Sequence, residues 1–386
     1  YLFFFLLFYL TILFISIISD FKYNSLSSSL FYFRFIFFAY AFAFSLHSYK
    51  NIHEKLLLCI IILLIFLSID AFFQYIFGYN FFGMENQYPW TAEHGDGEYH
   101  RISGIFGEEL KLGSYLFKMF SILTALFFLT KRFIRKYLII YLITFILVFS
   151  AILITGERTA LMHILMFLIL SLIVFNFNKK IKLLICILFI FIFTLFLNLD
   201  NELKKRYTTI LDTIYSMSNN LLIDNTEKKW AGWSIKPGDK ILFTTHHTRH
   251  YQTAFKMFSN NYLFGIGPKN YRKLCDNKIY YVEWGCSTHP HNIYMQLLSE
   301  TGLVGFMFIF SFFIYHFFLI VKEFYFKILS SSKSHIANYN SYMVILITIF
   351  INLFPLSPSG SFFNNWNSIL FFIPIGFLIF LKQNNE

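Results

Sequence analysis

The stretch "LLLCIIILLIFLSIDAFFQYIF", residues 56–77, decides the fold class of this sequence. The hydrocarbon core of a bilayer is about 30 Å thick, and a helix needs roughly 20 consecutive, mostly apolar residues to cross it. Residues 56–77 meet that requirement, and similar runs recur along the chain. The predicted spans are approximately 1–19, 31–46, 56–77, 112–130, 137–154, 159–176, 181–198, 291–320, 340–354 and 366–381. We therefore expect an all-α polytopic membrane protein with about ten transmembrane helices.

The composition supports this class and excludes an ordinary soluble globule. Of the 386 residues, 57% are hydrophobic and only 14% are charged, whereas an average soluble domain has about 25% charged residues. The sequence starts at Tyr1, inside an apolar run without a basic leader or a small-residue cleavage site. We expect that run to be a span and not a signal peptide, and the chain to be N-terminally incomplete.

Lysine and arginine residues in the short connections predict the orientation. One alternate set of connections, which we expect in the cytoplasm, carries them in groups at residues 50–55, 131–136, 179–182 and 322–333. The other set should face outward, and it comprises 20–30, 78–111, 155–158, 199–290 and 355–365.

Two outward connections are longer than turns and divide the chain. We expect transmembrane helices over residues 1–198, with a loop at 78–111. One large, partly helical loop should cover 199–290, and C-terminal transmembrane helices should cover 291–386. No matched pair of Gly- or Pro-interrupted spans is visible, which argues against a secondary transporter.

The large outward loop has recognisable local patterns. Amphipathic spacing predicts a helix at 201–217 and a second at 244–258, followed by a turn at 261–271. Cys275 and Cys286 also lie here, where an oxidising compartment could join them. Their spacing alone leaves the disulfide open.

The net charge of +11 points to an anionic ligand and not to nucleic acid. Much of this charge lies in the cytoplasmic connections, where it would meet the anionic headgroups of membrane lipids. The outward loop 199–290 is different, because it holds thirteen Lys and Arg against eight Asp and Glu. The positive-inside rule does not explain that excess. A bound anion would.

The stretch "STHPHNIYMQLLSETG", residues 287–302, opens the apolar run after this loop. Pro290 suits the first position of a helix, so we expect His291 in the first turn, where the helix dipole favours a neutral imidazole that accepts a proton. Asn292, Gln296 and Ser299 would form a polar stripe that faces the protein interior. The alternative is that His291 is only an interfacial capping residue.

Three arginines on the outward side are candidate anion ligands: Arg101 in "RISGIFG", Arg158 in "TGERTALM" and Arg249 in "HHTRHYQ". The planar guanidinium fork binds phosphate oxygens bidentately. Arginines at a membrane boundary also snorkel without further function. The orientation predicted from the connections places all three on the same side as His291, and we expect the four residues to share one pocket.

Other patterns in the outward loops are weaker. His246 and His250 have helical i, i+4 spacing, but no third ligand is suitably placed, so we expect no metal site. Gly265 and Gly267 follow no strand and indicate a tight turn, not a dinucleotide loop. Glu108 and Glu109 could be an acid–base pair or part of a solvated loop.

Four segments, in this order and separated by spans, resemble the O-antigen ligase and polymerase family of bacterial envelope glycosyltransferases. They are "RISGIFGEELKLGSYL" (101–116), "TGERTALM" (155–162), "TRHYQTAFKMFSNNYLFGIGPKNY" (248–271) and "HPHNIYMQLLSETGLVGF" (289–306). The most specific element is HN-x-x-x-Q-x-x-x-E-x-G-x-x-G. Glu157 and the pair Glu108–Glu109 depart from the residues common in the family.

The resemblance implies a transferase in the bacterial inner membrane with its active face in the periplasm. Its donor would be a glycan on undecaprenyl diphosphate, and its acceptor would be a sugar hydroxyl of lipid A-core or of a growing glycan. It implies that His291 activates the hydroxyl, that Arg158 and Arg249 bind the diphosphate, and that no metal or other cofactor is needed. We also assign substrate binding to Arg101, Asn292, Gln296, Gly265 and Gly267.

Related activities remain open at this point. A ligase, a polymerase and a protein O-glycosyltransferase of the same family differ only in the acceptor, and we prefer the ligase because the histidine motif is well preserved. A transporter or flippase of lipid-linked glycans is the alternative from another class. It would place charged residues within the spans, along a pathway, whereas here the candidate residues gather at one face.

Overall fold

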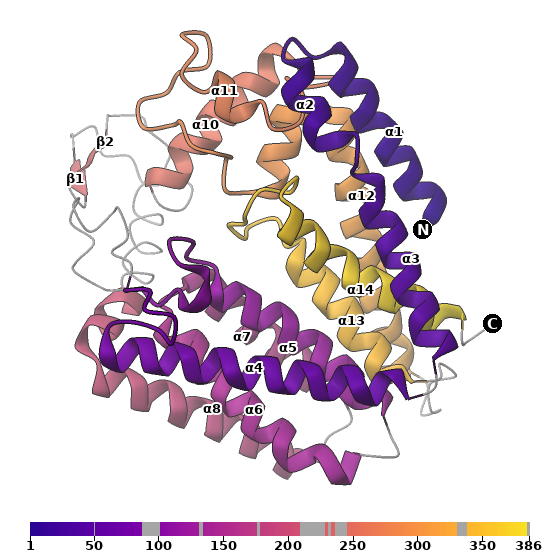
Figure 1. The fold of residues 1–386 in the computed structure, drawn as a ribbon, viewed down its shortest axis with the longest axis vertical. Coiled ribbons are helices and arrows are strands. Elements are labelled where there is room, and N and C mark those ends of the chain that lie inside the picture. Colours follow the sequence, from indigo (N-terminus) through magenta and orange to yellow (C-terminus); the bar gives the residue numbers. More distant parts are fainter. Residues whose placement is uncertain are drawn as a thin grey trace. The chain divides into compact units, whose positions relative to one another are not determined.

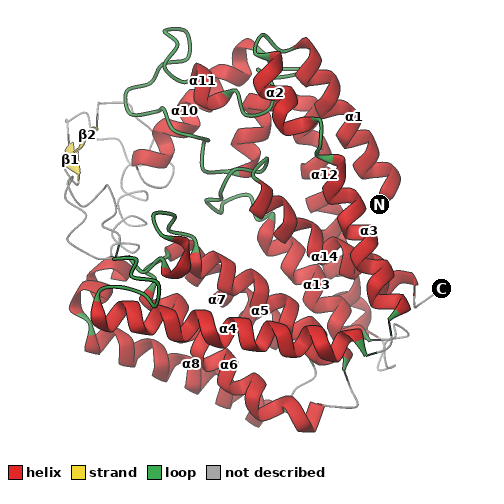
Figure 2. Ribbon diagram, in the orientation of Figure 1, coloured by secondary structure: helices red, strands yellow, loops and turns green. Residues whose placement is uncertain are grey.

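The computed structural model describes residues 1–49, 51–86, 101–130, 134–175, 178–208, 228–230, 233–235, 245–329 and 338–383 (Figure 1). Across these residues the chain is almost entirely helical (Figure 2). The named strands among them are β1 (Lys228–Trp230) and β2 (Trp233–Ile235), a short antiparallel pair in the large loop. The predicted all-α class is confirmed.

The chain folds into two compact units, Tyr1–Lys50 with Leu242–Glu386, and Asn51–Ile241. The first unit contains the helices α1 (Leu2–Ile18), α2 (Lys22–Ser29), α3 (Phe33–Ser48), α10 (Thr245–Asn260), α11 (Tyr271–Leu274), α12 (Ile293–Leu329), α13 (Tyr339–Asn352) and α14 (Asn365–Gln383). The second unit contains α4 (Ile52–Phe77), the 3-10 turn η2 (Gly104–Phe106), α5 (Leu112–Leu129), α6 (Ile134–Ile154), α7 (Arg158–Val174), α8 (Lys179–Leu199) and the β1–β2 pair.

The long helices fall on the predicted spans. Seven helical segments among the described residues are long and apolar enough to cross a membrane, and three further apolar helices, α1, α7 and α13, are shorter. Their surfaces fit a lipid environment. On α8, for example, Leu183, Ile187 and Ile190 are 61%, 54% and 58% exposed, which would be costly in water but not against hydrocarbon tails.

In the second unit, α4, α5 and α6 pack side by side (Figure 1). Phe120 and Phe127 of α5 stack on Tyr141 of α6, with ring centroids 5.8 Å and 4.3 Å apart. Such stacking adds to the dispersion that holds helices together where no hydrophobic driving force exists between them. This packing fixes the ends of α5, α6 and α7, which carry the polar groups described below.

In the first unit, α14 packs along α3. A Cβ atom on Gly376 would come within 2.5 Å of the Ala39 carbonyl oxygen, so only glycine permits this approach. Phe5 of α1, Tyr32 and Phe372 of α14 are buried in the core beside this contact.

The helix α12 is broken at Gly302, which has φ 64° and ψ −166°. The break leaves the carbonyls of Ser299 and Glu300 without helical partners. The amides of Ile266 and Gly267 donate to these carbonyls at 2.9 Å each. One interrupted span is therefore present, although the sequence shows no matched pair of them.

The large loop does not stand apart as one piece. Its described end, from α10 onward, packs against α12 in the first unit. Its beginning belongs to the second unit, where residues 201–208 are helical and Leu203 and Tyr207 are buried. The remainder of the predicted 201–217 helix lies outside the described residues. The predicted 244–258 helix is α10.

Candidate active site

The backbone around His291 differs from the predicted helix start. The helix α12 begins at Ile293, and His291 precedes it with a left-handed φ of 56°. Asn292 is the capping residue, because its Oδ1 accepts the amides of Tyr294 at 2.9 Å and Met295 at 3.1 Å. The prediction that Pro290 starts the helix and His291 lies in its first turn is wrong. An asparagine side chain at the N-cap satisfies two free amides that proline would leave exposed.

The polar stripe on α12 faces inward as predicted, and it holds the connection between α13 and α14. Asn292 Nδ2 donates to the carbonyls of Pro355 at 2.8 Å and Ser357 at 3.3 Å. Gln296 accepts the Phe362 amide at 2.8 Å through Oε1. Asn292 and Gln296 therefore position this connection. Their predicted contact with substrate stays a prediction.

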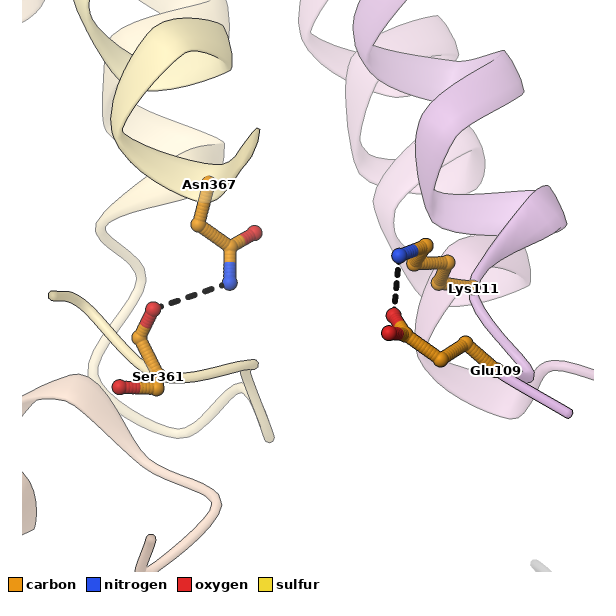
Figure 3. Close-up of polar contacts among 4 residues, drawn as sticks. All are labelled: Glu109, Lys111, Ser361 and Asn367. Atoms are coloured by element: carbon orange, nitrogen blue, oxygen red, sulfur yellow. Dashed lines mark hydrogen bonds and ion pairs between the residues drawn. The ribbon is translucent and has the colours of Figure 1, made fainter. Parts of the chain in front are cut away.

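The connection 353–364 in turn fixes His291. The Ser359 amide donates to the His291 carbonyl at 2.9 Å. Further along, Asn367 Nδ2 of α14 donates to the Ser361 carbonyl at 3.1 Å (Figure 3). The hydrogen bond from Ser359 thus holds the backbone of His291 in its left-handed conformation, and Asn367 in turn holds the connection.

Three other imidazole rings surround His291. The centroid distances from its ring are 4.2 Å to His289, 5.3 Å to His250 and 5.8 Å to His247. His247 and His250 come from α10, so the helix predicted in the large loop brings its histidines to the motif. Sequence reasoning identified His291 but assigned no part in the site to His289 or His247, since helical spacing does not reveal contacts between separate segments.

His289 has a defined tautomer. Its Nε2 lies 3.2 Å from the Ser359 carbonyl, which can only accept, so Nε2 carries the proton. Its Nδ1 then accepts from the Thr288 hydroxyl at 2.9 Å. Burial lowers the pKa of His289 to about 4, with the Ser359 hydrogen bond opposing and the charge of Arg272 adding to the shift. The ring beside His291 is therefore neutral near pH 7.

The loop closed by the disulfide between Cys275 and Cys286 positions a second histidine, His250. Cys275 and Cys286 are joined, which settles the question left open by their spacing. The carbonyl of Gly285 in this loop accepts from His250 Nδ1 at 3.0 Å and from the Tyr271 hydroxyl at 2.6 Å. Burial lowers the pKa of His250, and the bond to Gly285 opposes that shift.

Arg249 lies on α10 between His247 and His250. Its Nη1 is 3.4 Å from Gln252 Oε1, a long hydrogen bond within the same helix. The side chain is half-buried. Its place beside the histidines fits the predicted role in this part of the site.

Gly265 and Gly267 have a structural explanation. A Cβ atom on Gly265 would lie 2.6 Å from backbone atoms of Glu300 and Gly302, and one on Gly267 would lie 2.4 Å from Ser19 Oγ. Both have positive φ, 65° and 98°. They let the turn 261–271 enter the break in α12. Direct substrate binding by these glycines stays a prediction.

In the second unit, Glu157 directly precedes α7, and its buried side chain lies at the start of α5. Its Oε1 accepts the Gly113 amide at 2.7 Å, and its Oε2 accepts the amide and hydroxyl of Ser114 at 3.1 Å and 2.8 Å. A carboxylate is favourable at the N-terminus of a helix. Burial raises the pKa of Glu157, whereas Arg101 and these hydrogen bonds oppose the rise. The departure from the family pattern at this position thus forms a cap that ties the hairpin before α7 to α5.

The side chains of Arg158 and Arg206 each donate a hydrogen bond to a backbone carbonyl of the other residue's segment. Arg158 Nε donates to the Arg206 carbonyl at 3.1 Å, and Arg206 Nε donates to the Gly156 carbonyl at 2.7 Å. The Tyr207 hydroxyl donates to the Leu153 carbonyl at 2.9 Å. Sequence reasoning missed Arg206, which lies within the predicted amphipathic helix at 201–217.

Arg101 lies near the same group. Its charge lowers the pKa of Glu157, and together with the charges of Arg158 and Arg206 it acts on Tyr207. Its Nε is buried and has no hydrogen-bond partner among the described residues. Three guanidinium groups thus accompany a single buried carboxylate, an arrangement suited to an anion.

The remaining predicted features have separate outcomes. Glu108 and Glu109 are exposed, and Glu109 forms an ion pair with Lys111 (Figure 3). This fits the solvated-loop alternative. Within the described ranges, the one group of three possible metal ligands is Cys275, Asp276 and Cys286, and the disulfide uses its two thiols. The side chain of His246 lies outside the described residues.

The four predicted residues are distributed over the two units. Arg249 and His291 belong to the first unit, and Arg101 and Arg158 belong to the second. The structure brings Arg249's helix to His291, and it brings Arg101 and Arg158 to Glu157. One pocket shared by all four stays a prediction.

Residues 143–310 match the family model described as O-Antigen ligase. The matched region contains Arg158, Arg249, Gly265, Gly267, His291, Asn292 and Gln296. Arg101 lies before it. No curated protein matches the sequence. The family match confirms the resemblance to the O-antigen ligase and polymerase family.

Proposed function

From the O-antigen ligase family domain at residues 143–310, we propose that the protein is a glycosyltransferase that moves a glycan from undecaprenyl diphosphate to a sugar hydroxyl of lipid A-core. The coarser statement, an activity of the O-antigen ligase and polymerase type, follows from the family itself. The observation that carries the finer proposal is the histidine of the family motif, held in a strained conformation against a neutral ring. The reaction would take place at the periplasmic face of the inner membrane.

His291 is the proposed base. The acceptor hydroxyl forms a bond to the anomeric carbon while the bond from that carbon to the diphosphate breaks. The hydroxyl proton passes to the imidazole, and undecaprenyl diphosphate leaves with the electron pair. His289 supports this role because its own ring is neutral and anchored to Ser359, so it does not repel the imidazolium that forms. Displacement by one acceptor inverts the anomeric configuration.

Arginine side chains are the proposed partners of the diphosphate. Negative charge grows on the leaving group in the transition state, and guanidinium groups already in position stabilise it without proton transfer. By their match to the family motifs, Arg158 and Arg249 take this role. Arg101 adds to it, and Arg206 positions Arg158 through the backbone contact. No step requires a metal or another cofactor.

A polymerase of the same family would use the same donor and differ in the acceptor. The preserved histidine motif favours the ligase. The two activities are separated by the product, because a ligase yields lipid A-core carrying the glycan and a polymerase yields a longer glycan still attached to undecaprenyl diphosphate.

The test is His291→Ala in a strain whose lipopolysaccharide depends on this protein. We expect loss of long-chain lipopolysaccharide on a gel, with the variant inserted in the membrane at the wild-type level. His47→Ala is the matched control, because His47 is exposed at the end of α3 and belongs to no proposed site. Undiminished long-chain product from the His291 variant would remove the base from the mechanism. The purified reaction should proceed equally well with EDTA present.

A further inference from the structure

Backbone strain marks a position that the proposed reaction does not use. Among the described residues, the non-glycine residues with positive φ are Asn51, Lys269, Trp284, His291 and Asn338. Asparagine tolerates this conformation, whereas lysine, tryptophan and histidine do so at a cost. All three of the costly residues belong to the first unit. The conformation of His291 is accounted for by its role as the proposed base. The positive φ of Lys269, 61°, has no such explanation in the proposed reaction.

The surrounding backbone imposes the conformation of Lys269. Asn24 Nδ2 of α2 donates to the Lys269 carbonyl at 3.0 Å. The neighbouring Asn270 is fully buried and donates to Ser19 Oγ at 2.8 Å and Ser25 Oγ at 2.9 Å. Anchors on both sides therefore keep a lysine at a position where a glycine would be unstrained.

Two arginines accompany this lysine. Arg272 on α11 and Arg34 in the first turn of α3 are exposed, and Arg34 Nη2 donates to Asn365 Oδ1 at 2.6 Å. Burial lowers the pKa of the half-buried Lys269, and the like charges of Arg272 and Arg34 lower it further. We call these three residues the basic cluster.

The basic cluster lacks compensating charge. The ion pairs found among the described residues are Lys111–Glu109 and Lys136–Glu54, so no carboxylate of the described residues lies within 4.0 Å of a charged nitrogen of the cluster. Glu300, fully buried on α12, is the acid that opposes the shift of Lys269. Its oxygens accept the Tyr271 amide at 3.2 Å and Gln296 Nε2 at 2.9 Å. Lys269 and Arg272 thus share the carboxylate of Glu300, which is already engaged in these two hydrogen bonds.

The basic cluster adjoins the histidines. Arg272 is near enough to lower the pKa of His289. The connection 353–364 contacts His289 and His291 through Ser359, and it leads directly into Asn365, which holds Arg34. Arg34 and the proposed base are therefore tied to the same short stretch of the first unit.

We propose that Arg34, Lys269 and Arg272 bind a phosphate group on the lipid-linked saccharide that accepts the glycan. The proposal rests on the proposed function, in which the diphosphate of the donor has Arg158 and Arg249 as its partners. Guanidinium forks bind phosphate oxygens bidentately, and a partly desolvated lysine adds a point charge. The exposed arginines are open to a ligand that arrives in the headgroup layer, and the adjacent histidines would receive its hydroxyl.

Binding is tested first, without donor. The full-length protein in phosphatidylcholine nanodiscs is titrated with lipid A-core and with the same lipid after phosphatase treatment. We expect the phosphorylated lipid to bind at least about tenfold more tightly. Arg272→Gln and Arg34→Gln should each remove most of that difference. Lys278→Gln, which changes an exposed cation outside the basic cluster, should leave it intact.

Two results would overturn the proposal. One is equal affinity of the wild-type protein for both lipids. The other is a loss of binding when phosphatidylglycerol replaces part of the phosphatidylcholine, since the site would then belong to ordinary phospholipid headgroups. In the transfer reaction, Arg272→Gln should raise KM for the phosphorylated acceptor by about tenfold and change kcat by less than about twofold. Phosphate-dependent binding without any transfer would refute the proposed function and leave this site in place.

Discussion

At the scale of single residues, Asn292 and His291 show what the motif predicts and what it leaves out. The residue types in "HPHN" pointed to a helix start, which is present at Ile293, and to a candidate base, which stays a prediction. They did not show that Asn292 caps the helix, which moves its start to Ile293 and puts His291 at φ 56°. Proline and asparagine both suit helix starts, and the choice between them depends on the acceptors at Pro355 and Ser357, far away in the sequence.

Arg206 is a residue whose part in the candidate site the sequence did not predict. Its sequence context, a polar face of a short helix, is common among solvated residues. Its significance comes from a carbonyl, that of Gly156, which accepts from Arg206 Nε at 2.7 Å. Every residue has a backbone carbonyl, so the sequence does not show which carbonyl a side chain will bind. The positioning role of Arg206 could therefore be recognised only from the fold.

His289 should make stability depend on pH. Its pKa in the folded protein is about 4, against an ordinary value of 6.5, so the unfolded chain binds the proton more readily. The stabilisation is complete above about pH 6.5 and is lost progressively as the pH falls towards 4. Thermal unfolding of the detergent-solubilised protein between these values should show a falling Tm, and His289→Gln should flatten the slope.

The glutamine variant is a suitable comparison because its side-chain amide can still donate to the Ser359 carbonyl. His250, whose pKa is also lowered by burial, contributes in the same direction, so some slope should remain. Identical pH dependence in the variant and the wild type would show that His289 does not titrate in the way its burial indicates.

At the scale of elements, the spans were predictable because their physics is local. A run of about 20 apolar residues forms a helix in a bilayer, because a helix makes all the hydrogen bonds of its backbone groups within the segment. The break in α12 was not predictable in this way. Gly302 sits in an apolar helical run like any other glycine, and its role comes from the turn at 261–271 that fills the gap.

Gly302→Ala should therefore destabilise the first unit severely. A Cβ atom there would lie 2.3 Å from the Leu263 carbonyl oxygen and 2.5 Å from the Phe264 amide nitrogen. Both are backbone atoms that cannot rotate away, and the φ and ψ of Gly302 are accessible essentially to glycine alone. We expect a loss of several kcal/mol, on the order of 3 or more, seen as a large fall in Tm or in the folded yield.

Gly78→Ala is the matched control for this change. Gly78 also has a positive φ, 84°, but a Cβ atom there would meet nothing within 4 Å. Its cost should stay near 1–2 kcal/mol, roughly that of the left-handed conformation alone. Similar losses at both positions would mean that the turn 261–271 does not occupy the break as tightly as its hydrogen bonds indicate.

At the scale of the whole molecule, the sequence predicted the class and the order of spans, but not how the large loop is shared. Residues 199–290 read as one insertion, because every stretch between the flanking spans is more polar than they are. In the fold, its first part joins the second unit through Tyr207, and its last part joins the first unit through α10 and the disulfide loop. Partition between units depends on tertiary contacts, which hydropathy does not encode.

The last prediction concerns the orientation of the chain in the membrane, because both proposed sites must lie outside the cytoplasm. Cysteines are introduced one at a time at Ser27, Glu202 and Lys180, all exposed in the structure, after Cys59 and Cys186 are replaced by alanine. The disulfide consumes the two remaining thiols. In intact spheroplasts, a membrane-impermeant maleimide should label positions 27 and 202, and position 180 only after permeabilisation. The positive-inside rule requires this pattern, since residues 179–182 carry three lysines in a short connection. Labelling of position 180 from outside would invert the topology and place His291 in the cytoplasm, where the proposed donor, an undecaprenyl-linked glycan at the periplasmic face, could not reach it.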